Sequence, residues 1–337
     1  MTNGRCSRPH PLLVRETPPR SELRERVIRT LRLRHYSRST EKAYVGWIRR
    51  FIEHFHKHPD RMGREEIRAF LSHLAVERQV SPSTQNQALN ALVFLYRNVL
   101  GRDVGLIEGI ERAKRKRRLP VVMSREEVRA VLDRLQGRQR LMATLLYGAG
   151  LRLSECARLR TQDIGFGSSQ IMVRGGKGDK DRVTLLPQDI NQALRKHLDQ
   201  VKTQHDEDLC RNAGWVELPR ALHRKYPNAG RQWAWQWVFP ATSIYYHRAT
   251  NQRRRHHYHQ SALQRAVKIA IAEAGIQKKA SCHTFRHSFA THLLEDGVDI
   301  RTVQALLGHT SLNNTMIYTH VLGNRFAGIR SPADRLR

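Results

Sequence analysis

Residues 283–291 read His-Thr-Phe-Arg-His-Ser-Phe-Ala-Thr and open a helical pattern late in a chain of 337 residues. His283 and Arg286 are three positions apart, so a helix would present both on one face. Further along, a Leu-Gly-His triplet ends at His309, and Tyr318 follows nine positions later. This part of the chain therefore offers several basic side chains and one tyrosine for a common site.

Another arginine lies far upstream, next to a glycine turn. Residues 148–155 read Gly-Ala-Gly-Leu-Arg-Leu-Ser-Glu, which places Arg152 directly after the turn and Glu155 three positions later. Two β-rich runs then flank the Gly-rich residues 175–179, and this pattern predicts a β-hairpin with Lys177 in its turn. The turn is not a nucleotide-binding P-loop, because a glycine follows the lysine where that loop needs Ser or Thr.

These residue types suit phosphoryl transfer at a DNA phosphodiester. Two arginines, Arg152 and Arg286, can clamp the non-bridging oxygens and stabilise the charge that develops on them. The hydroxyl of Tyr318 can attack phosphorus and hold the broken strand as a covalent ester, if a base or strong local cations help a group whose ordinary pKa is near 10. Lys177 on its hairpin can donate a proton to the departing 5′ oxygen. Such a reaction needs no metal or other cofactor, and we expect none.

The charge of the chain indicates a polyanionic partner. Lys and Arg number 60 against 30 Asp and Glu, a formal net charge of +30. So large a charge repels itself in a compact state unless a polyanion neutralises it, and nucleic acid is the first candidate before an anionic membrane surface. No apolar run is long enough to span a bilayer, and the basic N-terminal stretch lacks the apolar core of a signal peptide. We therefore expect neither membrane insertion nor secretion.

The cysteines and histidines do not indicate a metal site. The four cysteines are scattered without a Cys-x-x-Cys pair, which fits a reducing cytosol. We expect Cys282 to be a small buried residue at a helix start rather than a thiol nucleophile. The cluster of His256, His257 and His259 follows three arginines and has no carboxylate nearby, so we do not expect it to bind metal.

Apolar residues recur at helical spacing over four stretches in the first third of the chain. The clearest single face consists of Tyr44, Trp47, Ile48, Phe51, Ile52 and Phe55. The other stretches are Glu22–Leu33, about Arg64–Arg78, and the residues after Ser81-Pro82-Ser83. Together they predict a small helical domain over residues 21–105.

The rest of the chain predicts a second domain that is mainly helical with a small sheet. A capping box at Ser124–Glu127 opens a helix, the β-rich runs Gln170–Arg174 and Arg182–Leu186 form the hairpin, and helices dominate again from about Ser261. The predicted organisation is a flexible tail over 1–20, the helical domain over 21–105, a basic linker over 106–120, a catalytic domain over 121–330 and a tail over 331–337.

Two basic segments have a composition of their own. In the linker, six of the nine residues 112–120 are cationic and none is anionic, and we take Arg115 and Arg117 as candidates for contact with DNA phosphates. An insert over about 205–258 holds four of the five tryptophans and ends in the run Arg-Arg-Arg-His-His-Tyr. Aromatic rings interleaved with cations suit stacking on unpaired bases, although each tryptophan taken alone is more often a core residue.

Taken together, these stretches resemble the signature boxes of the tyrosine recombinases, the phage integrase family. Residues 143–155 resemble the first box, and residues 283–291 with the later Leu-Gly-His and Tyr318 resemble the second. The similarity covers about residues 21–330. It implies a mainly α fold with a small β-sheet, in which a helical core-binding (SAM-like) DNA domain precedes an α+β catalytic domain. One departure is Phe285, where leucine is common in this box.

The resemblance also implies a role for each matched residue. The implied roles are phosphate clamps at Arg152 and Arg286, the nucleophile at Tyr318, the general acid at Lys177, the group that handles the nucleophile's proton at His283, a contact to the scissile phosphate at His309, and a support for the first arginine at Glu155.

The insert narrows the resemblance. Residues 217–240 are similar to the extra segment of integron integrases, which ordinary phage and chromosome-dimer-resolving recombinases lack. In that group the segment contacts bases that protrude from a folded single strand of the cassette site, attC. The resemblance makes Trp235, His256 and His257 the candidates for these contacts. It implies an integron integrase that acts on folded attC and duplex attI, as a homotetramer on two DNA sites in the bacterial cytoplasm.

Three other functions stay open. A phage or transposon integrase acting only on duplex DNA would share the core, but the Trp-rich insert argues against it. A DNA-binding protein without catalysis would share the charge, but the complete set of catalytic residue types argues against it. A type IB topoisomerase shares the tyrosine chemistry, but it would need neither the insert nor an assembly tail.

Overall fold

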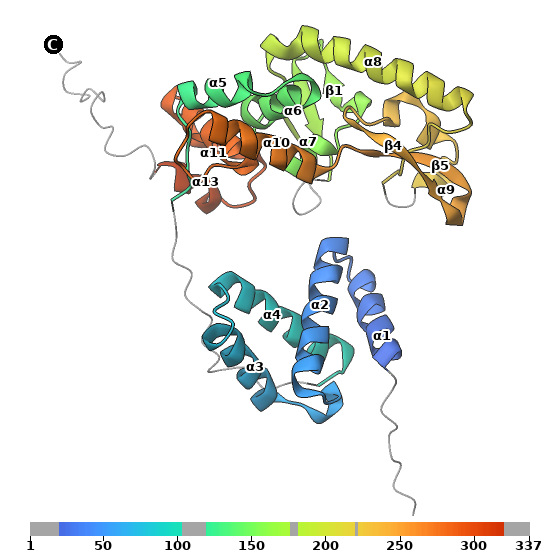
Figure 1. Ribbon diagram of the computed structural model, residues 1–337, viewed down its shortest axis with the longest axis vertical. Coiled ribbons are helices and arrows are strands. Elements are labelled where there is room, and N and C mark those ends of the chain that lie inside the picture. Colours follow the sequence, from blue (N-terminus) through green and yellow to red (C-terminus); the bar gives the residue numbers. More distant parts are fainter. Residues whose placement is uncertain (1–19, 103–118, 176–180, 220–221, 320–337) are drawn as a thin grey trace, which may run out of the picture. The chain divides into compact units, whose positions relative to one another are not determined.

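The computed structural model describes residues 20–102, 119–175, 181–219 and 222–319. The chain divides into two compact units, Met1–Arg117 and Arg118–Arg337 (Figure 1). Both expected tails lie outside the described residues, apart from Arg20, where the first helix begins. Arg115 and Arg117 of the predicted linker and Lys177 of the predicted hairpin turn also lie outside them.

The N-terminal unit is built of helices. Its main elements are α1 (Arg20–Leu33), α2 (Arg38–Phe55), α3 (Arg64–Val76) and α4 (Pro82–Phe94), which continues into a π-helical turn at Leu95–Val99. Serine caps set two of the starts, since Ser37 accepts the backbone N–H of Thr40 and Ser81 accepts that of Thr84.

Aromatic rings fill the core of this unit. Phe51 is fully buried and makes edge-to-face contacts with Phe55 and Phe70. Trp47 and Ile48 are buried with it on one side of α2, which confirms the apolar face predicted for this helix.

The C-terminal unit is mainly helical, as predicted, and it has two small sheets where one was expected. Its elements in chain order are α5 (Arg125–Asp133), α6 (Gly137–Gly148), α7 (Leu153–Ala157), β1 (Ile164–Gly165), β2 (Gln170–Val173), β3 (Arg182–Leu185), α8 (Asn191–Cys210), α9 (Leu222–Lys225), β4 (Pro240–His247), β5 (Gln252–His257), α10 (Gln260–Glu273), α11 (Cys282–Glu295), α12 (Ile300–Leu307) and α13 (Asn313–Thr319), with short 3-10 turns between them.

Both sheets are antiparallel. The first has the order β1-β2-β3, and β2 pairs with β3 from Gln170 opposite Leu185 to Val173 opposite Arg182, so the predicted hairpin is confirmed. The second consists of β4 and β5. Because α8 continues to Cys210, the predicted insert over about 205–258 begins inside this helix and then forms the β4–β5 hairpin (Figure 1).

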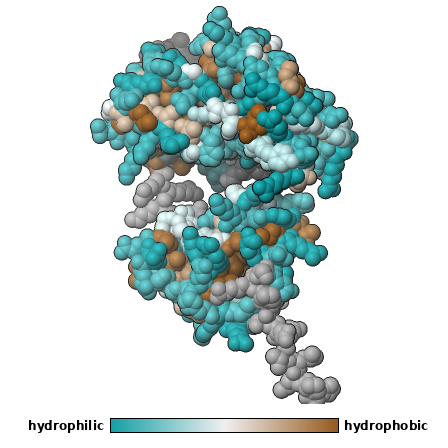
Figure 2. Space-filling model, turned by 45° about the vertical axis from the view of Figure 1, so that its right-hand side comes forward, coloured by the Kyte–Doolittle hydropathy of each residue, from teal (hydrophilic) through white to brown (hydrophobic). Residues whose placement is uncertain are grey.

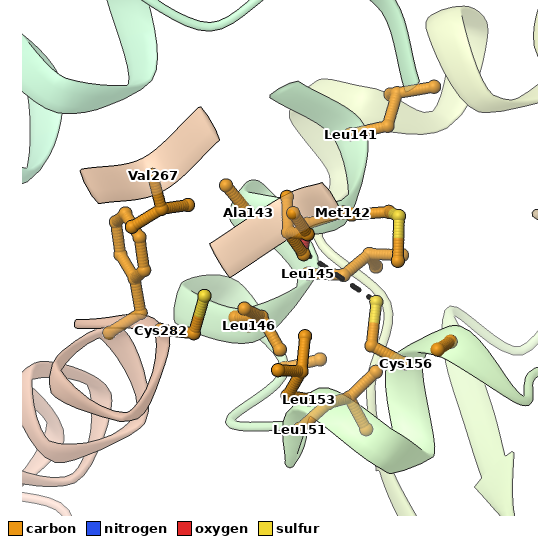
Figure 3. Packing of buried hydrophobic residues seen from close by; sticks show 14 of the residues in the cluster. Leu141, Met142, Ala143, Leu145, Leu146, Leu151, Leu153, Cys156, Val267 and Cys282 are labelled. Carbon is orange, nitrogen blue, oxygen red and sulfur yellow. Dashed lines mark hydrogen bonds between the residues drawn. The ribbon is translucent and has the colours of Figure 1, made fainter. Parts of the chain in front are cut away.

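The central helix of the C-terminal core is α6. Its residues Met142, Leu145 and Leu146 are fully buried, and α10 and α11 pack against it. Figure 3 shows Cys156 and Cys282 within this apolar cluster. Burial raises the pKa of both thiols, that of Cys282 to about 11, so neither forms a thiolate at neutral pH. The prediction that Cys282 is a buried residue at a helix start is confirmed.

The surface is mostly hydrophilic, whereas the core is apolar. On the face shown in Figure 2, hydrophilic residues cover most of both units, and apolar side chains gather only in small patches. Within the described ranges, none of the helices combines the length and the apolar character needed to cross a bilayer.

A buried ion pair joins the insert to α8. Arg255 on β5 binds both carboxylate oxygens of Asp208, with Nε–Oδ2 and Nη2–Oδ1 distances of 2.7 and 2.8 Å. Arg255 also donates to the carbonyls of Ala241 and Thr242 on β4. This pair therefore fixes the hairpin to the long helix.

We expect Asp208→Ala to lower the free energy of unfolding by about 3–5 kcal/mol, because it leaves the charge of Arg255 buried without its partner. Urea denaturation of the full chain, followed by circular dichroism, measures the loss. Asp206→Ala is the matched control, since Asp206 pairs with Lys202 on the exposed side of the same helix and should cost no more than about 1 kcal/mol. Equal losses in the two variants would contradict a stabilising role for the buried Asp208–Arg255 pair.

Candidate active site

One buried carboxylate gathers three arginines from different elements. Glu155 on α7 accepts from the backbone N–H of Arg152 at 2.9 Å and from its Nη1 at 2.6 Å. Arg182 on β3 donates to both carboxylate oxygens, at 3.0 and 2.6 Å. Nη1 of Arg286 on α11 lies 3.9 Å from the same carboxylate. The structure thus brings together Arg152 and Arg286, the two predicted phosphate clamps, which are far apart in the sequence.

The charge state of Glu155 follows from these contacts. Burial alone would raise the pKa of its carboxyl, whose side chain is only 7% exposed. The hydrogen bonds and charge of Arg182, together with the bonds from Arg152, outweigh burial and lower the pKa to about 2. Glu155 is therefore an anion throughout the physiological range, but it balances only part of the charge of three guanidinium groups.

Arg286 is held from the backbone side. Its Nη1 donates to the carbonyl of Gly150, and its Nη2 donates to the carbonyl of Leu307 at 2.5 Å. Burial, with the charges of Arg152 and Arg182, lowers the pKa of Arg286 to about 9, so it stays cationic at pH 7. Because two carbonyls fix the guanidinium, its orientation does not depend on a bound ligand.

Two glycines allow the segments around the arginine cluster to pack closely. Gly150 has φ +59°, and a Cβ there would come within 2.4 Å of the ring of Phe289. Gly308 ends α12 with φ +62°, and a Cβ there would meet the side chain of Arg182 at 2.6 Å. Both positions therefore require glycine for backbone conformation and for space.

His309 follows directly after that helix end. Its Nε2 lies 3.3 Å from Nη2 of Arg286, and its Nδ1 lies 3.0 Å from the hydroxyl of Thr315. A guanidinium only donates, so Nε2 accepts and Nδ1 carries the proton. Burial and the neighbouring arginines lower the pKa of His309 to about 4, which keeps the imidazole neutral at pH 7.

Tyr318 lies on α13 beside these groups. It is buried, and its ring is nearly parallel to that of His309, with centroids 6.4 Å apart. Its hydroxyl is 3.0 Å from Nδ1 of His287. Burial raises the pKa of Tyr318, while the charges of Arg286 and Arg152 act in the opposite direction.

His283 has a different environment from the one implied for it. It is exposed at the start of α11, and among the described residues its side chain makes no hydrogen bond to Tyr318. Burial of part of the ring, with the charges of Arg286 and Arg152, lowers its pKa. The histidine in contact with the tyrosine hydroxyl is His287, one helical turn further on.

The insert contributes a cavity of about 370 Å³ next to this cluster. Trp235, His256 and His257 all line it, and Ser154 and Glu155 of α7 line it as well. The structure therefore brings the three predicted base contacts together, and it places them beside α7, whose N-cap residue is Arg152.

The three side chains differ in exposure. His256 is exposed, Trp235 is partly buried and His257 is buried. Burial, with the neighbouring His256 and two arginines, lowers the pKa of His257 to about 4. Trp237 is a core residue that stacks near His256 and donates to the carbonyl of Arg255.

Arg160 contacts three residues that line the cavity, Trp237, Trp235 and Glu217. Its guanidinium lies 3.1 Å from the centroid of the Trp237 ring and donates to the carbonyls of Trp235 and Glu217, at 2.7 and 2.6 Å. Burial lowers its pKa to about 9. Stacking and two hydrogen bonds from one side chain hold both walls of the cavity in place.

Three residues of the site were not predicted from the sequence. His287 had a usable signal, because it stands four positions after His283 at helical spacing. Arg182 and Arg160 had none, since an arginine at a strand start or in a turn is usually exposed. Within the described part of the chain, no group of three metal-ligating side chains is found.

Comparison with known proteins shows the family of the chain. The model of the phage integrase family matches residues 121–325, and that of the phage integrase N-terminal SAM-like domain matches residues 23–106. An integrase/recombinase of Escherichia coli is 49% identical over 94% of this chain and 93% of its own length. The tyrosine recombinase XerA of Thermococcus onnurineus is 34% identical over 85% of this chain and 86% of its own.

Two solved structures show the same fold at low sequence identity. The XerH site-specific recombinase bound to palindromic difH substrate, in a post-cleavage complex, has a TM-score of 0.57 at 20% identity and covers 87% of this chain and 79% of its own. A lambda integrase dimer bound to a COC′ core site has a TM-score of 0.56 at 16% identity, with 88% and 96% covered.

We expect the arginine cluster to give the protein a specific acid sensitivity. The pKa of Glu155 is about 2 in the folded chain against about 4.5 when unfolded, so its stabilisation is present above pH 4.5 and is lost as pH falls toward 2. Between pH 6 and pH 3 this group should cost about 2 kcal/mol of the free energy of unfolding.

Urea denaturation at the two pH values measures this effect. Glu155→Gln should be less stable at pH 6, because the arginines lose their counter-charge, and should lack that part of the acid loss. Glu207→Gln, at an exposed position of α8, should keep the wild-type pH dependence. An unchanged acid loss in Glu155→Gln would contradict the prediction.

Proposed function

The chain belongs to the phage integrase family and is a tyrosine site-specific recombinase, and we propose that it inserts and excises integron gene cassettes. It would cleave one strand of folded attC or duplex attI through a 3′-phosphotyrosine and rejoin that strand to a partner. The phosphotyrosine keeps the energy of the phosphodiester, so the reaction needs no ATP. The observation that carries the proposal is the cavity that joins Trp235, His256 and His257 to the active-site helix.

The cluster supports the chemistry of strand cleavage. Arg152 and Arg286 clamp the scissile phosphate, because the carboxylate between them leaves an excess of positive charge for an anion. The Tyr318 hydroxyl attacks phosphorus, and His309 contacts the phosphate from the same side as Arg286. The proposal also includes Lys177 as the acid for the 5′ oxygen and His283 as a further proton-transfer group.

The cavity supports recognition of an unpaired base. A base inside regular duplex is stacked and paired, whereas a base that protrudes from a folded strand presents its face and edges. The cavity offers a partly buried indole at Trp235, an exposed imidazole at His256 and the nearby cations Arg158 and Arg174. Aromatic stacking combined with cationic contact is the usual way in which proteins hold such a base.

One observation favours a second candidate, an integrase that acts only on duplex DNA. Trp237 is buried and already stacked under Arg160, so at least part of the aromatic insert serves as core. If Trp235 does the same, the insert is structural. Binding to the two DNA forms separates the two candidates.

The proposal includes the assembly and the place of action. Recombination between two sites needs four active protomers, so we propose a homotetramer on two DNA sites, working on DNA in the bacterial cytoplasm. The net charge of +30 supports the DNA contact and predicts that affinity falls steeply with salt.

Covalent trapping tests the proposed reaction. End-labelled attC, offered once as a folded single strand and once as duplex, should form a detergent-resistant adduct with the protein, and the folded strand should form more of it. Tyr318→Phe should bind DNA and form no adduct, because the attacking oxygen is gone. An adduct in Tyr318→Phe would overturn the nucleophile, and an adduct confined to duplex would favour the second candidate.

Trp235→Ala tests the base contact. It should weaken binding to folded attC by about 10-fold or more, in line with a stacking loss of about 1–3 kcal/mol, and leave duplex binding nearly unchanged. Trp233→Ala is the matched control, since Trp233 lies in the same 3-10 turn but does not line the cavity. Gel-shift titrations measure both affinities. Equal losses on the two DNA forms would make Trp235 a core residue.

A further inference from the structure

Two histidines on α11 stand one turn apart, on either side of Arg286, and only one of them contacts Tyr318. His283 is exposed, while His287 is partly buried against α13. The Tyr318 hydroxyl is 3.0 Å from Nδ1 of His287, and the ring centroids are 5.7 Å apart. This hydrogen bond joins the proposed attacking oxygen to a titratable group.

The protons in this hydrogen bond can be assigned. His283 and Arg286 on the same helix face His287, as do His309 from the loop after α12 and Tyr318 from α13. Burial, with the charges of His283 and Arg286, lowers the pKa of His287 to about 4, so it is neutral at pH 7. The burial of Tyr318 raises the pKa of its phenol, which therefore keeps its proton. The hydroxyl then donates, Nδ1 accepts, and the proton of the imidazole is on Nε2.

We propose that His287 is a catalytic residue that accepts the hydroxyl proton of Tyr318 as the phenolic oxygen attacks the phosphodiester. The inference rests on the proposed function, in which Tyr318 is the nucleophile. The O–H bond breaks and its proton moves to Nδ1, the Oη–P bond forms, and the P–O5′ bond breaks. The departing 5′ oxygen takes a different proton, from the Lys177 ammonium proposed as general acid. Rejoining runs these transfers in reverse.

The surrounding charges suit this role once DNA is bound. In the free protein Arg286 disfavours a proton on His287. A scissile phosphate held by Arg152 and Arg286 brings negative charge to the same place, which offsets the guanidinium charges and makes His287 a stronger base. The base therefore gains strength in the complex that needs it. His287 is thereby added to His283 as a proton-transfer group, since His287 is the histidine in contact with the Tyr318 hydroxyl.

His287→Asn tests the proposal, because the amide oxygen can still accept a hydrogen bond but cannot take the proton. His292→Asn is the matched control. His292 lies on the same helix, and its Nδ1 bonds the hydroxyl of Tyr147 at 2.9 Å, so this change breaks an equivalent pair outside the reaction. The substrates are attC in the reactive form, with an ordinary scissile phosphate or with sulfur in place of the 5′ bridging oxygen.

At pH 7, His287→Asn should slow adduct formation by about 100-fold or more, and His292→Asn should slow it by less than about threefold. The loss in His287→Asn should shrink as pH rises above 10 toward the raised pKa of the Tyr318 phenol, where the hydroxyl ionises without a base. Sulfur should not rescue this variant, since a thiolate leaving group replaces only the general acid. Sulfur should rescue Lys177→Ala. A wild-type rate, rescue by sulfur, or a loss that is constant with pH would each overturn the role of His287.

Two further measurements distinguish failure of the proposed function from failure of the role of His287. An adduct in Tyr318→Phe would remove the nucleophile and the proposed function with it, whereas an inactive Tyr318→Phe beside a fully active His287→Asn would remove only this inference. In DNA-free protein, nitrogen-15 NMR should show His287 as the Nε2–H tautomer at pH 7, with a changed Nδ1 shift in Tyr318→Phe. The Nδ1–H tautomer would overturn the proposal without any DNA substrate.

Discussion

The rest of the active site depends on the ion pairs between the buried carboxylate of Glu155 and three arginines. Arg152, Arg182 and Arg286 come from the N-terminus of a short helix, a strand and a long helix, and they would repel one another without a common anion. One buried carboxylate holds them but leaves two positive charges uncompensated. The folded chain therefore carries, in a mostly buried place, a charge excess that a phosphodiester would relieve. Binding energy is available there before any contact to a base is made, since the donors are already oriented.

The same constraint reaches the backbone. Arg286 bonds the carbonyls of Gly150 and Leu307, so the turn before α7 and the end of α12 are held at fixed positions around one guanidinium. The left-handed Gly308 then lets the side chain of Arg182 pass against the backbone, and it directs His309 toward Arg286. Gly150 leaves room for Phe289 of the second box, and Gly308 leaves room for Arg182 of β3, so the close packing of these distant segments depends on both glycines.

Much of the fold and of the site could be predicted from the sequence, and the features that could not share a physical cause. Helices with a strong apolar face and serine caps, such as α2, were predictable because local spacing and capping decide them. The residue types around Arg152 and Tyr318 were predictable from the chemistry that they suit. Arg182, Arg160 and the Asp208–Arg255 pair were not, because a buried arginine exists only through partners that are distant in sequence. The contact of Tyr318 with His287 instead of His283 depends on how α13 packs on α11, which spacing along one helix does not determine.

The insert shares an element with the catalytic cluster, and this has consequences for specificity. The cavity lined by Trp235 is also lined by Glu155 of α7, the helix whose N-cap residue is Arg152. Arg160, eight positions after Arg152, stacks on Trp237 and bonds the backbone of Trp235. A base held in the cavity would therefore lie against the helix that positions a phosphate clamp, with no loop in between. Under the proposed function, an unpaired base would then be recognised beside the same short helix that carries the already oriented Arg152 at its N-terminus.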